Sequence, residues 1–284
     1  MEGSDGAGAA RIQPDPARPL ANGVDRYANV IHCSVNMVHV ITRSTPRQQK
    51  REVTFDRIVD AAMRTVSAQG MDALTMQGLA ADLGFAVGAL YRYFPGKDAI
   101  VVAVQRRIVE AVGEELSAAL SIIDARAASR VGELTERDAA LLRLWVVVRV
   151  YQAMARTRPT EFGLLGLTMG DPRQLVQDAH AGELIPALAA LLQQVGALFA
   201  AAASCGALGD GDAARRTLVL WTSVQGALQL RKLERFQVGG LDAGAVLDEA
   251  VATLLLGCGA NAARSDAMKR RAHRLLGSLP RSKG

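Results

Sequence analysis

Residues 75–100 have the sequence TMQGLAADLGFAVGALYRYFPGKDAI, in which two short amphipathic stretches are separated by a glycine. The first stretch begins after Thr75, a favoured N-cap residue, and ends at Gly84, which can adopt the left-handed conformation of a helix C-terminus. Its expected buried face consists of Met76, Leu79, Ala80 and Leu83. The second stretch is predicted to be helical from about Val87 to Tyr93 and to be closed by Phe94. Two helices of this length joined at a glycine have the spacing of a helix-turn-helix.

The chain around this pair shows the apolar periodicity of α-helices. One helix is predicted from a Thr54 cap, with Asp56 in its first turn, to a stop at Gly70. Further helices are expected near 97–120, 136–157, 183–204, 212–236 and 243–257, with a turn or short helix around 161–179. Half of all residues are apolar, only 4% are aromatic, and the abundant Ala and Leu favour helices. We therefore predict an all-α fold, with an N-terminal three-helix domain that contains the helix-turn-helix and a helical C-terminal domain.

The second helix of the pair has side chains suited to the major groove of DNA. Small residues at its start, such as Gly88 and Ala89, let a helix backbone approach the bases closely, and Tyr91 and Arg92 project from the next turn. Leu90 is expected to face inward together with Phe94 and to anchor this helix to the first one.

Beyond its spacing, the segment resembles the DNA-binding domain of the TetR/AcrR family of transcriptional regulators. In that family a Thr-capped helix is followed by G-x-x-x-G-x-L-Y-x-[HY]-F-x-x-K. The matching residues here are Thr75, Gly84, Gly88, Leu90, Tyr91, Tyr93, Phe94 and Lys97. The preceding helix with its terminal Gly70 agrees as well.

The resemblance implies a sequence-specific DNA-binding transcriptional regulator of the cytoplasm and nucleoid, without enzymatic activity. The implied DNA-binding residues are Thr75, Gln77, Val87, Gly88, Ala89, Tyr91, Arg92 and Lys97, with Lys50 and Arg51 in a basic arm that also holds Arg47. The implied partners are double-stranded DNA, a second copy of the chain and a small-molecule effector. A homodimer would place two recognition helices in successive major grooves about 34 Å apart, so a near-palindromic operator is expected. A repressor released by its effector is the form of control that we favour.

Two residues depart from the family pattern. Ala86 stands where Ser or Thr usually caps the recognition helix, which costs about 1 kcal/mol, and Gly78 costs about as much in the first helix. The alternatives are that Tyr91 packs at the helix edge and that Arg92 and Lys97 are ordinary solvated charges. A second reading of the whole chain is a helical interaction protein whose helix-turn-helix no longer reads DNA.

Charge and composition suggest four segments. Residues 1–50 are predicted to be a disordered leader with a basic arm, 51–111 the DNA-binding domain, 112–258 a regulatory and dimerisation domain, and 259–284 a basic tail. The last 21 residues carry 7 basic and 1 acidic side chains, and residues 108–263 carry 13 and 17. Met37 is a candidate translation start, because the sequence after it resembles a compact protein.

The predicted dimer interface lies on two helices near the end of the chain. Apolar residues repeat along both: Leu218, Trp221, Val224, Leu228, Val251 and Leu254. Gly226 inside a helix costs roughly 1 kcal/mol relative to Ala, and close approach of a second copy would explain it. A purely intramolecular core is the alternative.

The effector pocket is expected among the middle helices. Its candidate lining residues are Trp145, Arg149, Tyr151, Met154, Phe162, Met169 and His180, although such side chains are also common in cores. Few polar groups belong to this set, so a hydrophobic or amphipathic ligand is predicted. Arg143 and Arg149 could bind an anionic group or pair with nearby acids.

Other functions lack their sequence signals. The motifs G-x-S-x-G and H-E-x-x-H, the P-loop and a G-x-G-x-x-G after a strand are all missing. Three scattered cysteines without a C-x-x-C spacing argue against disulfides, and no metal or cofactor is expected. No apolar run is expected to reach the roughly 18 residues of a membrane span, so no membrane partner is predicted.

Overall fold

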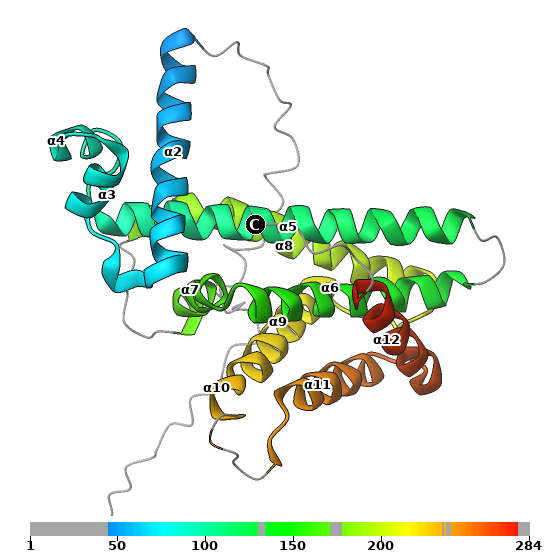
Figure 1. Cartoon of the computed structure of the whole chain (residues 1–284). Coiled ribbons are helices and arrows are strands. Elements are labelled where there is room, and N and C mark those ends of the chain that lie inside the picture. Colours follow the sequence, from blue (N-terminus) through cyan, green and yellow to red (C-terminus); the bar gives the residue numbers. More distant parts are fainter. Residues whose placement is uncertain (1–44, 130–133, 171–177, 235, 237–239, 278–284) are drawn as a thin grey trace, which may run out of the picture. The chain divides into compact units, whose positions relative to one another are not determined.

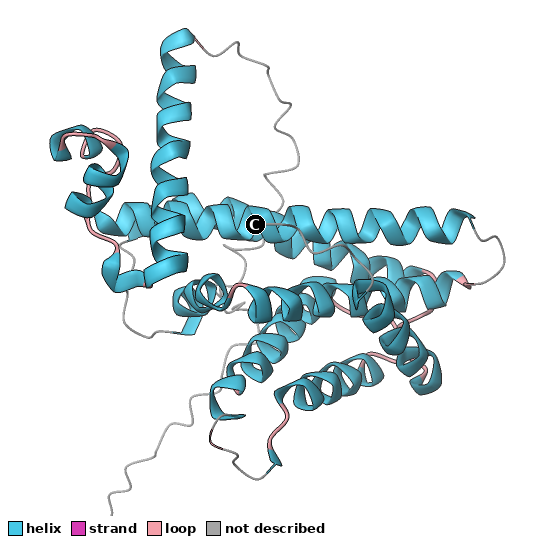
Figure 2. Cartoon of the chain, viewed as in Figure 1, coloured by secondary structure: helices cyan, strands magenta, loops and turns pink. Residues whose placement is uncertain are grey.

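The computed structural model describes residues 45–129, 134–170, 178–234, 236 and 240–277, and the regular elements in these ranges are all helical (Figures 1 and 2). The predicted all-α fold is confirmed. The N-terminal part consists of α2 (Pro46–Gln69), a 3-10 turn η2 (Met71–Ala73), α3 (Met76–Leu83), α4 (Val87–Leu90) and α5 (Lys97–Ser129). The remaining helices are α6 (Glu136–Thr157), α7 (Pro159–Gly170), α8 (Asp178–Ser204), α9 (Ala213–Gln229), α10 (Arg231–Glu234), α11 (Ala243–Gly257) and α12 (Ala262–Gly277). The expected leader, residues 1–44, lies outside the described residues.

The helix-turn-helix forms, but its second helix, α4, ends at Leu90 and not at the predicted Tyr93, and residues 91–93 form a turn. The Thr75 hydroxyl accepts a hydrogen bond from the Gly78 amide at 3.0 Å, and Gly84 ends α3 with a φ of 68°. Leu90 is fully buried, and the Phe94 ring stacks on Phe55 of α2 with 4.7 Å between centroids. These two anchors hold α4 against the other N-terminal helices, as expected.

Helix α2 begins about two turns earlier than predicted. Thr45 caps it in a capping box with Gln48, and Pro46 occupies its first position. Thr54, the predicted cap, lies inside the helix and donates its hydroxyl to the Lys50 carbonyl at 2.9 Å. The added turns are polar and exposed, so they carry no apolar stripe, and their start is set by the capping chemistry alone. The predicted basic arm is therefore helical from Pro46 onward.

Three pairings of long helices organise the rest of the chain. α5 packs along α8, α6 along α12, and α9 along α11. α7 contacts both α5 and α6, and it also touches α2. The 33-residue α5 therefore belongs to the helix-turn-helix domain at one end and to the C-terminal body along the rest of its length.

The predicted basic tail contains a packed helix, α12. Met268 and Ala272 are buried, and Ser265 accepts a hydrogen bond from the indole of Trp145 at 3.1 Å. These three residues form a narrow buried stripe. The helix was not predicted from apolar periodicity, because Lys and Arg residues occupy most other positions of the same turns. The sequence predicted a basic tail over residues 259–284 and no helix in it, whereas residues 262–277 form α12; residues 278–284 lie outside the described part of the chain.

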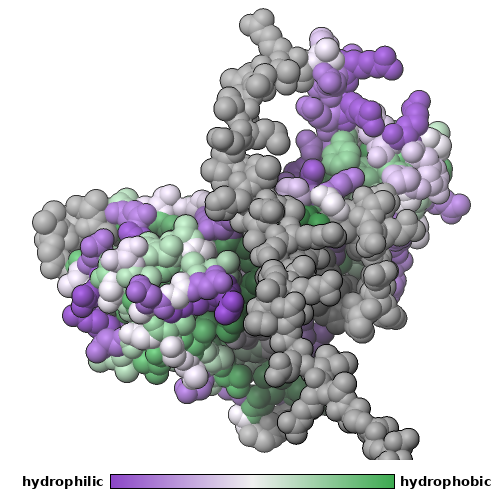
Figure 3. Space-filling model, turned by 180° about the vertical axis from the view of Figure 1, so that it is seen from behind, coloured by the Kyte–Doolittle hydropathy of each residue, from purple (hydrophilic) through white to green (hydrophobic). Residues whose placement is uncertain are grey.

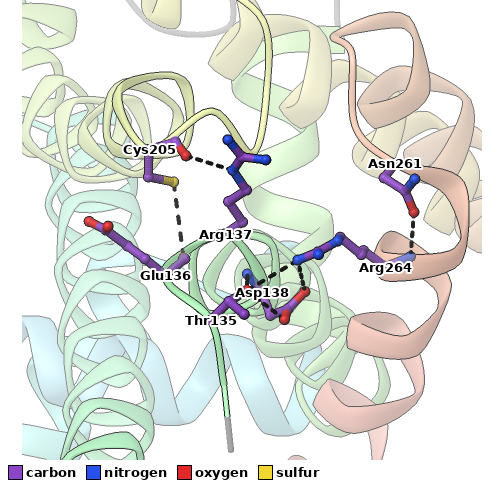
Figure 4. A network of polar contacts seen from close by, with 7 residues as sticks. All are labelled: Thr135, Glu136, Arg137, Asp138, Cys205, Asn261 and Arg264. Carbon is purple, nitrogen blue, oxygen red and sulfur yellow. Dashed lines mark hydrogen bonds and ion pairs between the residues drawn. The ribbon is translucent and has the colours of Figure 1, made fainter. Parts of the chain in front are cut away.

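A polar network holds the start of α12 to the start of α6 (Figure 4). The Arg264 guanidinium donates to the Thr135 hydroxyl at 3.2 Å and to the Asp138 carboxylate at 3.1 Å. Nearby, Arg137 Nε donates to the carbonyl of Cys205 at 3.0 Å, which joins the end of α8 to the same place. The network closes one end of the helical body.

One described helix is long and apolar enough to cross a bilayer by length and composition, namely residues 182–204 of α8. This corrects the expectation that no such run exists. The run contains Gln193 and Gln194, and α8 packs against α5, α6 and α9. Packed helices of other proteins can meet the same length and composition criterion, so the predicted absence of a membrane partner stays a prediction.

Candidate nucleic-acid interface and effector cavity

The end of α4 presents its polar side chains to solvent. Tyr91 is 53% exposed, and Arg92 is exposed beside it. Among the other predicted DNA contacts, Thr75, Gln77 and Gly88 are exposed, and Val87 and Ala89 are half-buried. The surface expected to read DNA is therefore accessible, and the packing alternative for Tyr91 does not hold within this chain.

Two sets of basic residues that are far apart in the sequence line one open groove. The groove lies between the first turns of α2 and the segment after α4, and its lining residues are Thr45, Arg47, Gln48, Lys50, Arg51, Thr54, Arg92 and Tyr93. In Figure 3, strongly hydrophilic residues gather over the N-terminal part of α2. Three cations of α2 and Arg92 thus face the same groove, an arrangement suited to a phosphate backbone.

Lys97 has an intramolecular partner. Its ammonium group donates to the Met71 carbonyl at 3.0 Å and is partly buried. This bond ties the first turn of α5 to η2. Lys97 therefore supports the helix-turn-helix, and its predicted contact with a phosphate would require this bond to be shared or exchanged.

The C-terminal body contains a partly open cavity of about 80 Å³ between α5, α6, α7, α8 and α9. The lining residues are Val109, Val112, Leu116, Val147, Val148, Val150, Tyr151, Leu165, Leu184, Leu188, Leu191, Leu192, Val195, Thr217, Leu220, Trp221 and Val224. Their side chains carry no formal charge at neutral pH. Burial raises the pKa of Tyr151 to about 12, so its phenol stays neutral, and it donates to Gln225 Oε1 at 2.7 Å. Such walls favour an uncharged apolar occupant.

Of the five predicted pocket residues whose side chains the structure describes, Tyr151 alone lines this cavity, and Phe162 packs edge-on against its ring. Trp145 turns toward Ser265 of α12, Met154 is part of the core, and Arg149 forms an ion pair with Asp248 at 2.7 Å. The side chains of Met169 and His180 lie outside the described residues.

Sequence reasoning missed the wall that α8 contributes. Its residues Leu184, Leu188, Leu191 and Val195 repeat at helical spacing, and this stripe was the available signal. Arg143 also has a local acid, Asp124, at 2.7 Å, so pairing is the observed alternative for both arginines.

The predicted dimer residues divide into two groups. Val224, Leu228 and Val251 are almost fully buried within the chain, because α9 and α11 pack on each other. Trp221 lines the cavity, Leu254 is half-buried, and Leu218 is 46% exposed. A dimer contact is therefore wrong for the three buried residues, for which the intramolecular core is the observed alternative. The outer surface of α9 carries Leu218, Val219 and Gly226.

A charged cluster joins α7 to its neighbours. Arg158 lies 2.7 Å from Glu115 of α5 and 3.3 Å from Glu161 of α7. The pKa of Glu161 is raised above its ordinary value of 4.5, mainly because burial disfavours the charged carboxylate. The positive charge of Arg158 lowers this pKa but does not cancel the effect of burial. Neutral Glu161 therefore stabilises the fold fully below pH 4.5, and this contribution is lost as pH rises through the raised pKa.

We predict that Glu161→Gln, which mimics the neutral acid, raises the melting temperature relative to the parent protein at about pH 7.5. The difference should shrink toward about pH 4.5, because parent Glu161 becomes protonated there. Thermal unfolding at both pH values measures it, with the exposed Glu114→Gln as the control. A difference that grows on acidification would contradict the assignment.

Comparison with known proteins identifies the N-terminal part of the chain. Residues 58–104 match the sequence profile of the bacterial regulatory proteins of the tetR family. This segment is of the TetR type. The TetR-type segment spans the second half of α2, both helices of the helix-turn-helix and the first two turns of α5.

Two curated relatives are transcriptional regulators of the HTH type. The HTH-type transcriptional repressor DrrR1 of Streptomyces coeruleorubidus is 38% identical over 66 residues, 23% of this chain and 24% of that protein. The HTH-type transcriptional regulator BetI of Brucella anthropi is 32% identical over 63 residues, 22% of this chain and 32% of that protein. The chain thus matches about a quarter to a third of the length of these relatives.

Solved structures extend the likeness in fold to about three quarters of the chain. The complex of RolR with resorcinol superposes with a TM-score of 0.55 at 18% identity, over 78% of this chain and 96% of RolR. A protein of unknown function from Rhodococcus sp. RHA1 gives 0.54 at 20% identity, over 72% and 94%. At these identities the likeness concerns the fold alone.

Proposed function

We propose that this chain is a DNA-binding transcriptional regulator of the bacterial cytoplasm. The observation that carries the proposal is the groove in which Lys50 and Arg51 of α2 meet Arg92, directly beside the exposed Tyr91. Cations at that place can bind phosphates while α4 contacts base edges. The family match and the repressor DrrR1 among the relatives support the same conclusion.

The finer proposal is a homodimeric repressor that a small ligand releases from a near-palindromic operator. The cavity supports the ligand: its lining is apolar, and RolR, which has the same fold, was solved with resorcinol. The exposed Gly226 on α9 supports the homodimer. A ligand lowers DNA affinity only to the extent that it binds one conformation of the protein more tightly than the other. The ligand must therefore favour a conformation in which the two recognition helices of the dimer lie at a different distance from each other.

The competing function is a helical interaction protein that does not read DNA. The feature that favours it is the short α4, whose N-cap Ala86 makes no side-chain hydrogen bond. A loosely held reader would bind DNA weakly and without sequence preference, whereas a regulator selects particular sequences from a random pool.

The test is selection from random double-stranded DNA, followed by titration of the selected sequence. We expect affinity that falls steeply with salt, and we expect Tyr91→Ala to weaken it about 10- to 100-fold without lowering the melting temperature. Gln69→Ala, an exposed change at the far end of α2, is the matched control. The absence of a selected sequence, or equal affinity of Tyr91→Ala and the parent, would contradict the proposal.

A further inference from the structure

One face of α5 changes from apolar to polar where the cavity ends. Val109, Val112 and Leu116 follow one another along this face and line the cavity. Gln105 lies one turn nearer to the helix-turn-helix on the same face and is 2% exposed. Burying a glutamine side chain in an apolar stripe costs free energy unless its amide is hydrogen-bonded. The burial of Gln105 therefore indicates that its amide makes a specific contact.

Gln105 holds α5 to the backbone of α7. Its Nε2 donates to the Leu164 carbonyl at 3.1 Å, a contact between residues 59 positions apart. A hydrophobic side chain at this place would pack equally well in several registers of α7 along α5. The amide of Gln105, bonded to the Leu164 carbonyl, favours a single register. Together with the ion pairs of Arg158 to Glu115 and Glu161, the bond therefore sets the position of α7 along α5.

The residue after Leu164 faces the cavity. Leu165 is part of its wall, and Phe162 packs edge-on against Tyr151, another wall residue, with 5.6 Å between ring centroids. α7 also contacts α2, which carries part of the basic groove. An occupant that displaces Leu165 must therefore either move α7 relative to α5 or move both together.

We propose that Gln105 is the positioning residue that couples the cavity to the helix-turn-helix, an inference that rests on the proposed function. Through its bond to Leu164, displacement of α7 is passed to the first turns of α5 and so to α3 and α4. When the Gln105 bond is removed, the ion pairs of Arg158 with Glu115 and Glu161 still join α7 to α5, but the tie at the turns of α5 nearest the helix-turn-helix is weakened, and less of the displacement reaches α3 and α4. α5 also lines the cavity directly through Val109, and the experiment separates the two routes.

The experiment uses cavity-filling substitutions in place of a ligand. Leu188→Phe and Val195→Phe add volume from α8, outside the helix-turn-helix, and each is made in the full-length parent and in Gln105→Met. Methionine keeps the length of glutamine and removes its amide. Gln194→Met is the matched control, because Gln194 Nε2 bonds Ser117 of the same helix α5 at 2.8 Å but joins it to α8.

The primary measurement is hydrogen exchange of the amides of residues 75–94, with affinity for selected DNA as the second. In the parent and in Gln194→Met, a folded filler variant is expected to change these exchange rates by about fivefold or more. In Gln105→Met the same filler should change them by less than about twofold. Two cavity-filling variants are used, so that if one of them misfolds the other still gives a measurement. A general loss of stability would be recognised because it would raise hydrogen exchange throughout the chain.

Equal filler effects in Gln105→Met and the parent would overturn the proposal and assign coupling to α5 itself. No effect of either folded filler in the parent would overturn it as well. If the parent selects no DNA, the proposed function fails, but hydrogen exchange still decides the role of Gln105.

Discussion

Simultaneous replacement of Lys50, Arg51 and Arg92 by glutamine is expected to weaken binding to the selected DNA by roughly 100- to 1,000-fold at moderate salt. Each cation that pairs with a phosphate releases a counterion, so affinity decreases as salt is added. The plot of log affinity against log salt should become less steep by about 0.9 for each phosphate that is no longer neutralised. All three side chains are exposed and line one groove, so their neutralisation should leave the melting temperature almost unchanged. Fluorescence anisotropy titrations at several salt concentrations measure both effects.

The control for this variant has the same change in net charge at other places. Arg156, Arg215 and Arg274 are exposed on α6, α9 and α12, and their replacement by glutamine should alter DNA affinity less than about threefold. Equal losses in the two triple variants would show that overall charge, and not the groove, attracts DNA.

The second large effect is expected at Gly226. No other part of the described chain lies within 4 Å of the place where a β-carbon would stand, although the residue is inside α9 and glycine costs roughly 1 kcal/mol there. If a second copy packs against this face, Gly226→Leu introduces overlapping side chains on both sides of the interface. We expect the dimer dissociation constant to rise about 100-fold and DNA affinity to fall with it, while the monomer stays helical.

Sedimentation of Gly226→Leu over a concentration series measures this effect, and circular dichroism reports the fold. Gly163 offers a matched control, because it is also exposed in a helix, and a β-carbon added to it would meet nothing within 4 Å. Gly163→Leu should leave the association state unchanged. A Gly226→Leu protein that dimerises like the parent, with a higher melting temperature, would place the dimer interface elsewhere.

Local chemistry explains which helices could be predicted from the sequence. α6 and α11 begin and end where expected, because Thr135 and Asp242 cap them through hydrogen bonds to Asp138 and Ala245 and their apolar residues fill a broad stripe. The prediction was wrong for α2 and α12 where the helix is polar. In both, stability comes from a capping box or from contacts with distant residues, which apolar periodicity does not detect.

The candidate site was predictable to the extent that it depends on position along one helix. The exposure of Tyr91 and Arg92 and the burial of Leu90 and Phe94 follow from the period of the helix and the turn after it. The partner of Lys97, which is the Met71 carbonyl, lies 26 residues away and leaves no sequence signal. The lining of the cavity could not be predicted from the sequence either, because five helices meet there. Only the packing of these helices decides that Trp221 lines the cavity while Trp145 does not.

The positions of the two tryptophans give the protein a pair of separate optical reporters. Trp145 is fully buried, with its indole bonded to Ser265, and it reports whether α12 is docked on α6. Trp221 is half-buried at the cavity wall, so its emission responds to what fills the cavity. Since these are the only two indoles of the chain, exchanging either for phenylalanine yields a protein whose fluorescence follows one event alone.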